Sequence, residues 1–271
     1  MRFDSNLAWK DAVQAVATNR DVLLALAGVF FMLPSLAVAL LIPQPEPQAG
    51  LTSEQTLAML MAYYRIAMPY MLAMSLIQAV GTLSVLTLFT DRARPTVGEA
   101  IRRGVSGVLP YLGAYLLLGL GVGLTGAVLI VVSAAVGVPA LAAVSGLGVA
   151  VAVIYIGIRM VLIAPVVAVD HVRNPIEALR RSWDLTRSNA ARLLVFFVLL
   201  GVIAIVVFLV IMAIMGVVLA MTAGGEAAKL VAAVVSSLLT GVMTLYFVAV
   251  MASIHRQLSG PSAAPVSATF E

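Results

Sequence analysis

The chain has 271 residues, of which 62% are hydrophobic and 10% are charged, with a formal net charge of +4 and no cysteine. Because an average soluble domain is about 45–50% apolar and about 25% charged, this composition excludes a soluble globular protein and predicts a chain that lies mostly in lipid. The lack of cysteine excludes disulfides, thiolate metal sites and cysteine nucleophiles, and the first 20 residues lack the continuous apolar stretch of a cleaved signal peptide.

Six apolar runs are long enough to cross a membrane as helices, since a spanning helix needs about 20 mostly apolar residues. Backbone groups in lipid must pair within the chain, and the runs lack the apolar–polar alternation of barrel strands, so helices are expected. The runs cover about residues 22–42, 66–90, 109–133, 141–169, 192–221 and 229–254. The sequence therefore predicts an all-α polytopic membrane protein, with one six-span domain over residues 1–260 and a disordered tail over 261–271.

Basic residues are concentrated in alternate segments between these runs. Thirteen of the sixteen lie before the first run, between the second and third, between the fourth and fifth, or around the start of the fifth and the end of the sixth. They are Arg2, Lys10, Arg20, Arg92, Arg94, Arg102, Arg103, Arg173, Arg180, Arg181, Arg187, Arg192 and Arg256. The positive-inside rule then predicts that both termini lie in the cytoplasm. Because membrane orientation accounts for the basic excess, no nucleic-acid partner is expected.

Three segments are predicted to be amphipathic helices that lie along the cytoplasmic interface, at about residues 5–18, 96–107 and 176–187. Each precedes a pair of spans, and "EAIRRGVSG" in the second nearly repeats "EALRRSWDL" in the third. This pattern predicts three copies of one unit, an interfacial helix followed by a helical hairpin. The charged faces either only anchor and orient the helices, or they contact anionic lipid head groups. The candidate head-group contacts are Arg102, Arg103, Arg180 and Arg181.

The stretch "RMVLIAPVVAVDHVRNPIEALRRSWDLTRSNAARLLVFFVLLG", residues 159–201, carries a family motif. Its matching positions are Arg159, Pro165, Asp170, Pro175, Glu177, Ala178, Leu179, Ser182, Trp183, Thr186 and Asn189. It resembles the core motif of the membrane-domain family of glycerophosphoryl diester phosphodiesterases, which is similar to the bacterial YciC-like inner-membrane proteins. The resemblance implies a multi-pass protein of the bacterial inner membrane. In some relatives this domain precedes a soluble phosphodiesterase that needs histidine and several carboxylates. Only eleven residues follow Gly260, so no phosphodiesterase domain is expected here.

Catalytic or metal-binding sets are not expected from the sequence. His171 and His255 are the two histidines, and both are interpreted as polar residues at cytoplasmic span ends. A metal site would need three or four converging ligands, and no nucleophile–base set or paired carboxylates can be found. The sequence therefore predicts a protein that is not an enzyme and holds no cofactor or metal.

Arg159 is the charged residue that lies inside a predicted span, about eleven residues before the end of that span near Asp170. At 1.5 Å per residue this distance is about 16 Å, which predicts a position near mid-bilayer. A charge there costs at least about 2.5–3.5 kcal/mol, so Arg159 should face other helices. It either couples helices through hydrogen bonds or meets an anionic group of a lipid or solute. The expected polar neighbours on the second and sixth runs are Gln78, Thr82, Thr240 and Thr244.

The function predicted from these features is that of an integral membrane protein that binds or helps move a lipid or other amphiphile. The expected partners are membrane lipids. The alternative is a membrane scaffold or accessory subunit without a transported ligand, which the lack of charged ion-relay residues favours.

Overall fold

The computed structural model describes residues 3–42, 50, 52–90, 95–222 and 225–260, and every regular element within these ranges is helical. In chain order the elements are α1 (Ser5–Thr18), α2 (Arg20–Ala27), the π-helical turn η1 (Gly28–Met32), α3 (Leu33–Leu41), α4 (Ser53–Thr90), α5 (Val97–Ala135), α6 (Pro139–Arg159), α7 (Ile163–Val169), α8 (Pro175–Thr186), α9 (Ala190–Thr222) and α10 (Glu226–Ser259). The predicted tail over 261–271, Arg2, Arg92 and Arg94 lie outside the described residues.

Six helical segments are long and apolar enough to cross a membrane. They are Arg20–Leu41, Ser53–Phe89, Val97–Ala135, Pro139–Val169, Ala190–Met221 and Glu226–Ser259. Each contains or nearly coincides with one predicted apolar run, so the all-α polytopic fold class and the six spans are confirmed.

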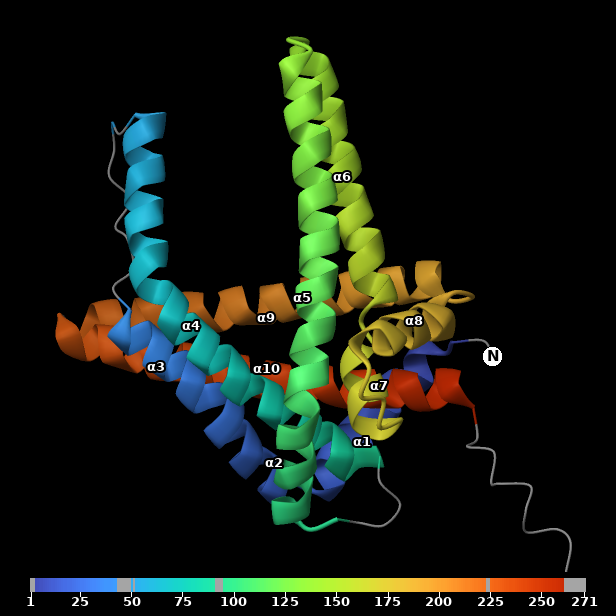
Figure 1. Ribbon diagram of the computed structural model, residues 1–271. Coiled ribbons are helices and arrows are strands. Elements are labelled where there is room, and N and C mark those ends of the chain that lie inside the picture. The colour runs from blue at the N-terminus through green and yellow to red at the C-terminus, as the bar shows by residue number, and fades with distance from the viewer. Residues whose placement is uncertain (1–2, 43–49, 51, 91–94, 223–224, 261–271) are drawn as a thin grey trace, which may run out of the picture.

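The spans are arranged as pairs that leave a common base in different directions (Figure 1). Helices α5 and α6 rise together, α9 and α10 run across the view, and α3 lies beside the lower part of α4. Pro69 lies inside α4, which changes direction along its length (Figure 1) because proline removes one backbone hydrogen bond and clashes with the preceding turn. Only 6% of the most apolar window of α5, and likewise of α9, is buried. These helices therefore present most of their apolar surface outward.

The core of the protein lies in the base, where the short helices meet the ends of the long ones. All residues of α7 from Ile163 to Val167 are buried, as are those of α10 from Val248 to His255. Helix α1 packs along α10, with Trp9 stacked on Tyr246 at 6.2 Å between ring centroids. This part of the molecule is a packed interior.

Both ends of the described chain lie at this base. The Phe3 amide donates to Asn189 Oδ1 at 2.9 Å, and the Asp4 amide donates to Gln257 Oε1 at 3.1 Å. Asp11 on α1 forms an ion pair with Arg256 on α10 at 2.9 Å. The first helix and the last one therefore hold each other on the same side of the molecule.

The predicted interfacial helices form separate elements in two places and not in the third. Helices α1 and α8 coincide with the predictions at 5–18 and 176–187, but the predicted helix at 96–107 is the beginning of the continuous helix α5. A capping box between Thr96 and Glu99 starts α5, and the helix continues through Pro110. Gly104 instead lets α5 lie close to α4, because a Cβ there would meet Ser84 Oγ at 2.3 Å. The threefold repeat is therefore not confirmed.

The fourth predicted span is also interrupted. Helix α6 ends at Arg159, and α7 begins only at Ile163. Pro165 explains the break, because it has no amide hydrogen for the carbonyl of Val161 and its ring clashes there. The 21 residues of α6 are about 31 Å long, which matches the roughly 30 Å of a bilayer core. Arg159 is therefore the last residue of α6 and lies inside the membrane-spanning segment Pro139–Val169, and its position near mid-bilayer stays a prediction.

Candidate functional site

The guanidinium of Arg159 is enclosed at the junction of α6 and α8. Arg159 is 1% exposed, and its guanidinium carbon lies 4.0 Å from the Trp183 ring centroid and 5.9 Å from that of Tyr155. Its Nε and Nη1 atoms are buried and have no hydrogen-bond partner among the described residues. The ring faces compensate part of the charge, by about 2 kcal/mol when desolvated. Two strong donors of a buried cation are left available for an acceptor.

The backbone of Arg159 holds α8 in place. Its carbonyl accepts hydrogen bonds from Ser182 Oγ at 2.9 Å and from Thr186 Oγ1 at 3.1 Å. The last carbonyls of a helix lack partners within the helix, so these two hydroxyls satisfy a group that α6 leaves open. Asn174 caps the start of α8, since its side chain accepts a hydrogen bond from the Ile176 amide at 2.9 Å. Several residues of the family motif thus fix α8 across the end of α6.

A second polar cluster lies on the other side of this junction, around Asp170. Its Oδ2 lies 3.2 Å from His255 Nε2 on α10 and forms an ion pair with Nε of Arg181 on α8. Burial alone would raise the pKa of Asp170, but the hydrogen bonds and charges of His255 and Arg181 outweigh it, so the pKa lies below its usual value. The cluster joins α7, α8 and α10.

The two histidines have different surroundings. His171 is exposed, as predicted for a polar residue at a span end, but His255 is buried. Its pairing with Asp170 was missed, because the two residues are 85 positions apart and only the packing of α7 on α10 brings them together. No group of three metal-ligating side chains occurs in the ranges that the structure describes.

The predicted polar neighbours of Arg159 lie elsewhere. Gln78 and Thr82 are partly exposed on α4, and Thr244 is partly exposed on α10. Thr240 is exposed on α10, and its hydroxyl donates to the Ser236 carbonyl at 2.8 Å. Helix α6 packs against α5, α8 and α9, and the contacts described for the Arg159 side chain are with α6 and α8. Among the described residues, the structure therefore does not gather these four side chains around Arg159.

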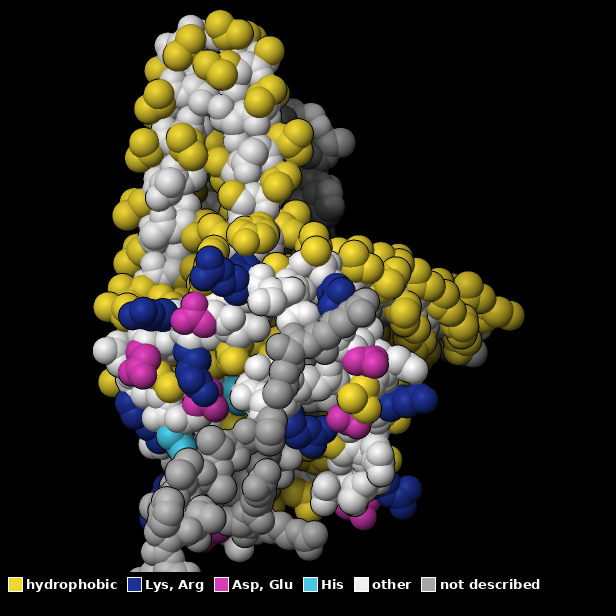
Figure 2. Space-filling view, turned by 90° about the vertical axis from the view of Figure 1, so that its right-hand side faces the viewer, with side chains coloured by type: hydrophobic (Ala, Val, Ile, Leu, Met, Phe, Trp, Pro, Cys, Tyr) yellow, Lys and Arg dark blue, Asp and Glu magenta, His cyan; other side chains and the backbone are white. Residues whose placement is uncertain are grey.

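The candidate head-group arginines lie at the base, where charged side chains gather next to the apolar helices (Figure 2). Arg102 and Arg180 are exposed, Arg103 is partly buried, and Arg181 is exposed while it pairs with Asp170. Two of them line an open polar cavity of about 600 Å³ between α8 and the ends of α9 and α10. Its lining consists of Glu177, Arg180, Arg181, Asp184, Leu185, Ser188, Asn189 and Leu258.

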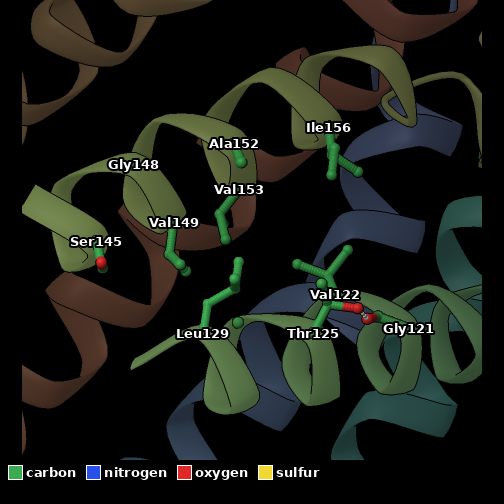
Figure 3. A pocket seen from close by; sticks show the side chains of 11 residues that line it. Gly121, Val122, Thr125, Leu129, Ser145, Gly148, Val149, Ala152, Val153 and Ile156 are labelled. Carbon is green, nitrogen blue, oxygen red and sulfur yellow. Dashed lines mark hydrogen bonds between the residues drawn. The ribbon is translucent and has the colours of Figure 1, made fainter. Parts of the chain in front are cut away.

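An apolar groove runs between α5 and α6 above Arg159. It has a volume of about 360 Å³, and its side chains point toward one another from the two helices (Figure 3). Near one end, Ser133 and Ser145 are joined by a hydrogen bond of 2.6 Å. At the other end the groove is lined by Ile156, three residues before Arg159.

Six spans of this length, an apolar outer surface and a charged base define a multi-pass integral membrane protein. Residues 136–259, which include α6 to α10, match the family described as the membrane domain of glycerophosphoryl diester phosphodiesterase. The resemblance predicted from the motif is thereby confirmed for this part of the chain. The match is to the membrane domain and not to a catalytic domain. No curated protein and no solved structure matches the chain.

Proposed function

We propose that this protein binds or helps move a lipid or other amphiphile with an anionic head, and that Arg159 receives the anionic group. The observation that carries the proposal is the buried guanidinium of Arg159, whose Nε and Nη1 have no partner among the described residues. An unpaired buried charge is costly. A phosphate or carboxylate would supply the missing acceptors in charge-assisted hydrogen bonds.

The position of Arg159 in the fold supports a lipid rather than a soluble anion. The 21 residues of α6 are about as long as a bilayer core is thick, and we propose that α6 alone crosses it, with its last residue at the depth of the head groups on the side of the base. The outward faces of the neighbouring helices are apolar. A ligand that reaches Arg159 from the membrane therefore has to be partly apolar itself.

The remaining parts of the proposal concern the base and its orientation. Arg102, Arg103, Arg180 and Arg181 contact further head groups, because basic side chains that flank spans attract anionic lipids. The base faces the cytoplasm of a bacterial inner membrane, as the excess of basic residues on that side favours. The protein carries out no catalysis of its own.

A scaffold or accessory role is the second candidate, and a specific observation favours it. The Arg159 carbonyl is bound by Ser182 and Thr186, and its guanidinium lies on Trp183. Arg159 can thus connect α6 to α8 without any bound ligand.

Native mass spectrometry of the purified protein separates the two candidates. If Arg159 binds a lipid, the wild-type protein carries phospholipid and the Arg159→Met variant does not. The variant stays folded, because the substitution leaves no unpaired buried charge behind. With a purely structural Arg159, the same change lowers the melting temperature and leaves the lipid content as it was. Arg65→Met, at an exposed position on α4, is the matched control and should change neither quantity. A wild-type protein that carries no lipid under conditions that retain lipid on other membrane proteins would contradict the proposed function.

A further inference from the structure

The groove between α5 and α6 presents an apolar surface, although Thr125 and Ser145 are among the residues that line it. Thr125 Oγ1 donates to the Gly121 carbonyl at 2.7 Å within its own helix (Figure 3), and Ser145 is paired with Ser133. The polar groups in the groove are therefore satisfied, and the surface offered to a ligand consists of hydrocarbon. Leu129, Ala152 and Val153 line the groove and are exposed. The groove thus opens sideways toward the surroundings of the hairpin, which are lipid for a spanning pair.

Arg159 continues the face of α6 that lines this groove. Residues 145, 149, 152, 156 and 159 are three or four apart, so they share one side of the helix. Side chains on a helix lean toward its N-terminus. The guanidinium accordingly lies 5.9 Å from the ring of Tyr155, four residues earlier. The guanidinium therefore lies toward the base end of the groove, where the lining ends at Ile156.

The length of the groove fits one leaflet of a bilayer. From Ser145 to Ile156 the lining covers eleven residue steps of α6, which is about 16 Å at 1.5 Å per residue. Half of a hydrocarbon core of roughly 30 Å is about 15 Å. A volume of about 360 Å³ is within the range of ligand sites, about 300–1,000 Å³.

We propose that the α5–α6 groove holds one acyl chain of an anionic phospholipid from the leaflet on the side of the base, with the phosphate bound at Arg159. This inference rests on the proposed function, and it specifies the class of ligand and the groove in which the ligand binds. The buried cation favours an anionic head group. The groove favours a hydrocarbon chain, because its polar side chains are already hydrogen-bonded within the protein. Because Arg159 is 1% exposed and lies against Tyr155 and Trp183, the phosphate reaches Nε and Nη1 when one of these side chains moves aside.

The experiment compares two tryptophan variants of the full chain. Ala152→Trp fills the groove, whereas Ala150→Trp places the same side chain about 200° away around α6, outside the groove lining. Each protein is purified in detergent and incubated with dimyristoyl phosphatidylglycerol or with uncharged dimyristoylglycerol. Bound lipid is counted by native mass spectrometry, and circular dichroism verifies that both variants keep the wild-type helix content.

The expected result is that wild type and Ala150→Trp bind the phosphatidylglycerol, that Ala152→Trp loses it, and that none of the three retains the uncharged diacylglycerol. Equal binding by the two variants would overturn the groove assignment. If Arg159→Met still abolished binding in that case, the proposed function would stand, but the acyl chain would bind outside the α5–α6 groove. Retention of the diacylglycerol by the wild type would overturn the role of the phosphate. A wild-type dimer that Ala152→Trp converts to a monomer would show that a second copy covers the groove, and would also overturn the inference.

Discussion

The guanidinium carbon of Arg159 lies 4.0 Å from the centre of the Trp183 ring, so that the end of helix α6 rests on a side chain of α8. The contact is between a buried cation and the residue type that binds cations best through its ring face. It joins α6 directly to α8, next to the break at Met160–Leu162 that separates α6 from α7. The ring of Trp183 therefore compensates part of the Arg159 charge at this junction.

Replacing Trp183 should destabilise the protein because the Arg159 charge would lose its main compensation. We expect Trp183→Ala to cost about 2 kcal/mol or more, since the ring also packs against the core. Trp183→Phe keeps a ring face and should cost clearly less. Unfolding in detergent, followed by circular dichroism, measures both values. If the two variants were equally stable, the stacking would have no energetic role.

The two hydroxyls on the Arg159 carbonyl should act cooperatively. Thr186 Oγ1 has one hydrogen and three carbonyls within reach, at 2.8 Å for Ser182, 3.1 Å for Arg159 and 3.2 Å for Trp183. Ser182→Ala is therefore expected to cost about 0.5–1.5 kcal/mol and Thr186→Val somewhat less. The double variant should cost more than the sum, because only then does the buried carbonyl lose every side-chain donor.

A double-mutant cycle in the same unfolding assay tests this coupling. Ser75→Ala, at an exposed position on α4, is the control and should stay within about 0.5 kcal/mol of the wild type. Strict additivity of the two changes in α8 would argue against a shared acceptor.

Acid should weaken the contact between α7, α8 and α10. The folded-state pKa of Asp170 is lowered, so the carboxylate contributes stability that is present above its ordinary value of about 3.9 and is lost as the pH falls through the folded-state value. The melting temperature should therefore drop on acidification below about pH 4. Asp170→Asn should flatten this part of the profile, because it removes the group that titrates.

Asp184→Asn is the matched control for this pH profile, since Asp184 is an exposed residue of α8. This variant should keep the wild-type drop. A profile of Asp170→Asn that is as steep as the wild type would mean that other groups cause the acid sensitivity.

The two termini should be found on the same side of the membrane. Residues Phe3 and Asp4 are bound to Asn189 and Gln257 at the base, and the distribution of basic residues predicts that this side is the cytoplasm. Fluorescent-protein fusions at either end should therefore be fluorescent, and alkaline phosphatase fusions should be inactive. Phosphatase activity at either end would refute this orientation.

Sequence periodicity was sufficient for the parts of the fold that depend on local composition. The six spans follow from apolar length, and α1 and α8 follow from amphipathic spacing that a cap or a proline starts. The course of α5 was not predictable, because it depends on the close approach of Gly104 to α4. The break before α7 had a signal in Pro165, but the apolar run continues through it and concealed the break.

The sequence predicted one residue of the candidate site, Arg159, but not the residues that surround it. Arg159 stood out because a charge inside an apolar run must be satisfied within the protein. The sequence places its partner Trp183 in the predicted interfacial helix at 176–187, but no pattern shows that this helix folds back across the end of α6. The same folding back brings Arg181 to Asp170, and α10 contributes His255. These contacts are set by tertiary packing.

The central claim is that Arg159 binds the phosphate of a lipid, and solid-state NMR in phospholipid bilayers tests it most directly. The measurement is the dipolar dephasing of arginine Nε signals, labelled with nitrogen-15, by the phosphorus of the lipid. The account predicts that the wild type has one dephased Nε signal that is missing from Arg159→Met. The claim would be contradicted if the signal that this substitution removes showed no dephasing by phosphorus in the wild-type protein.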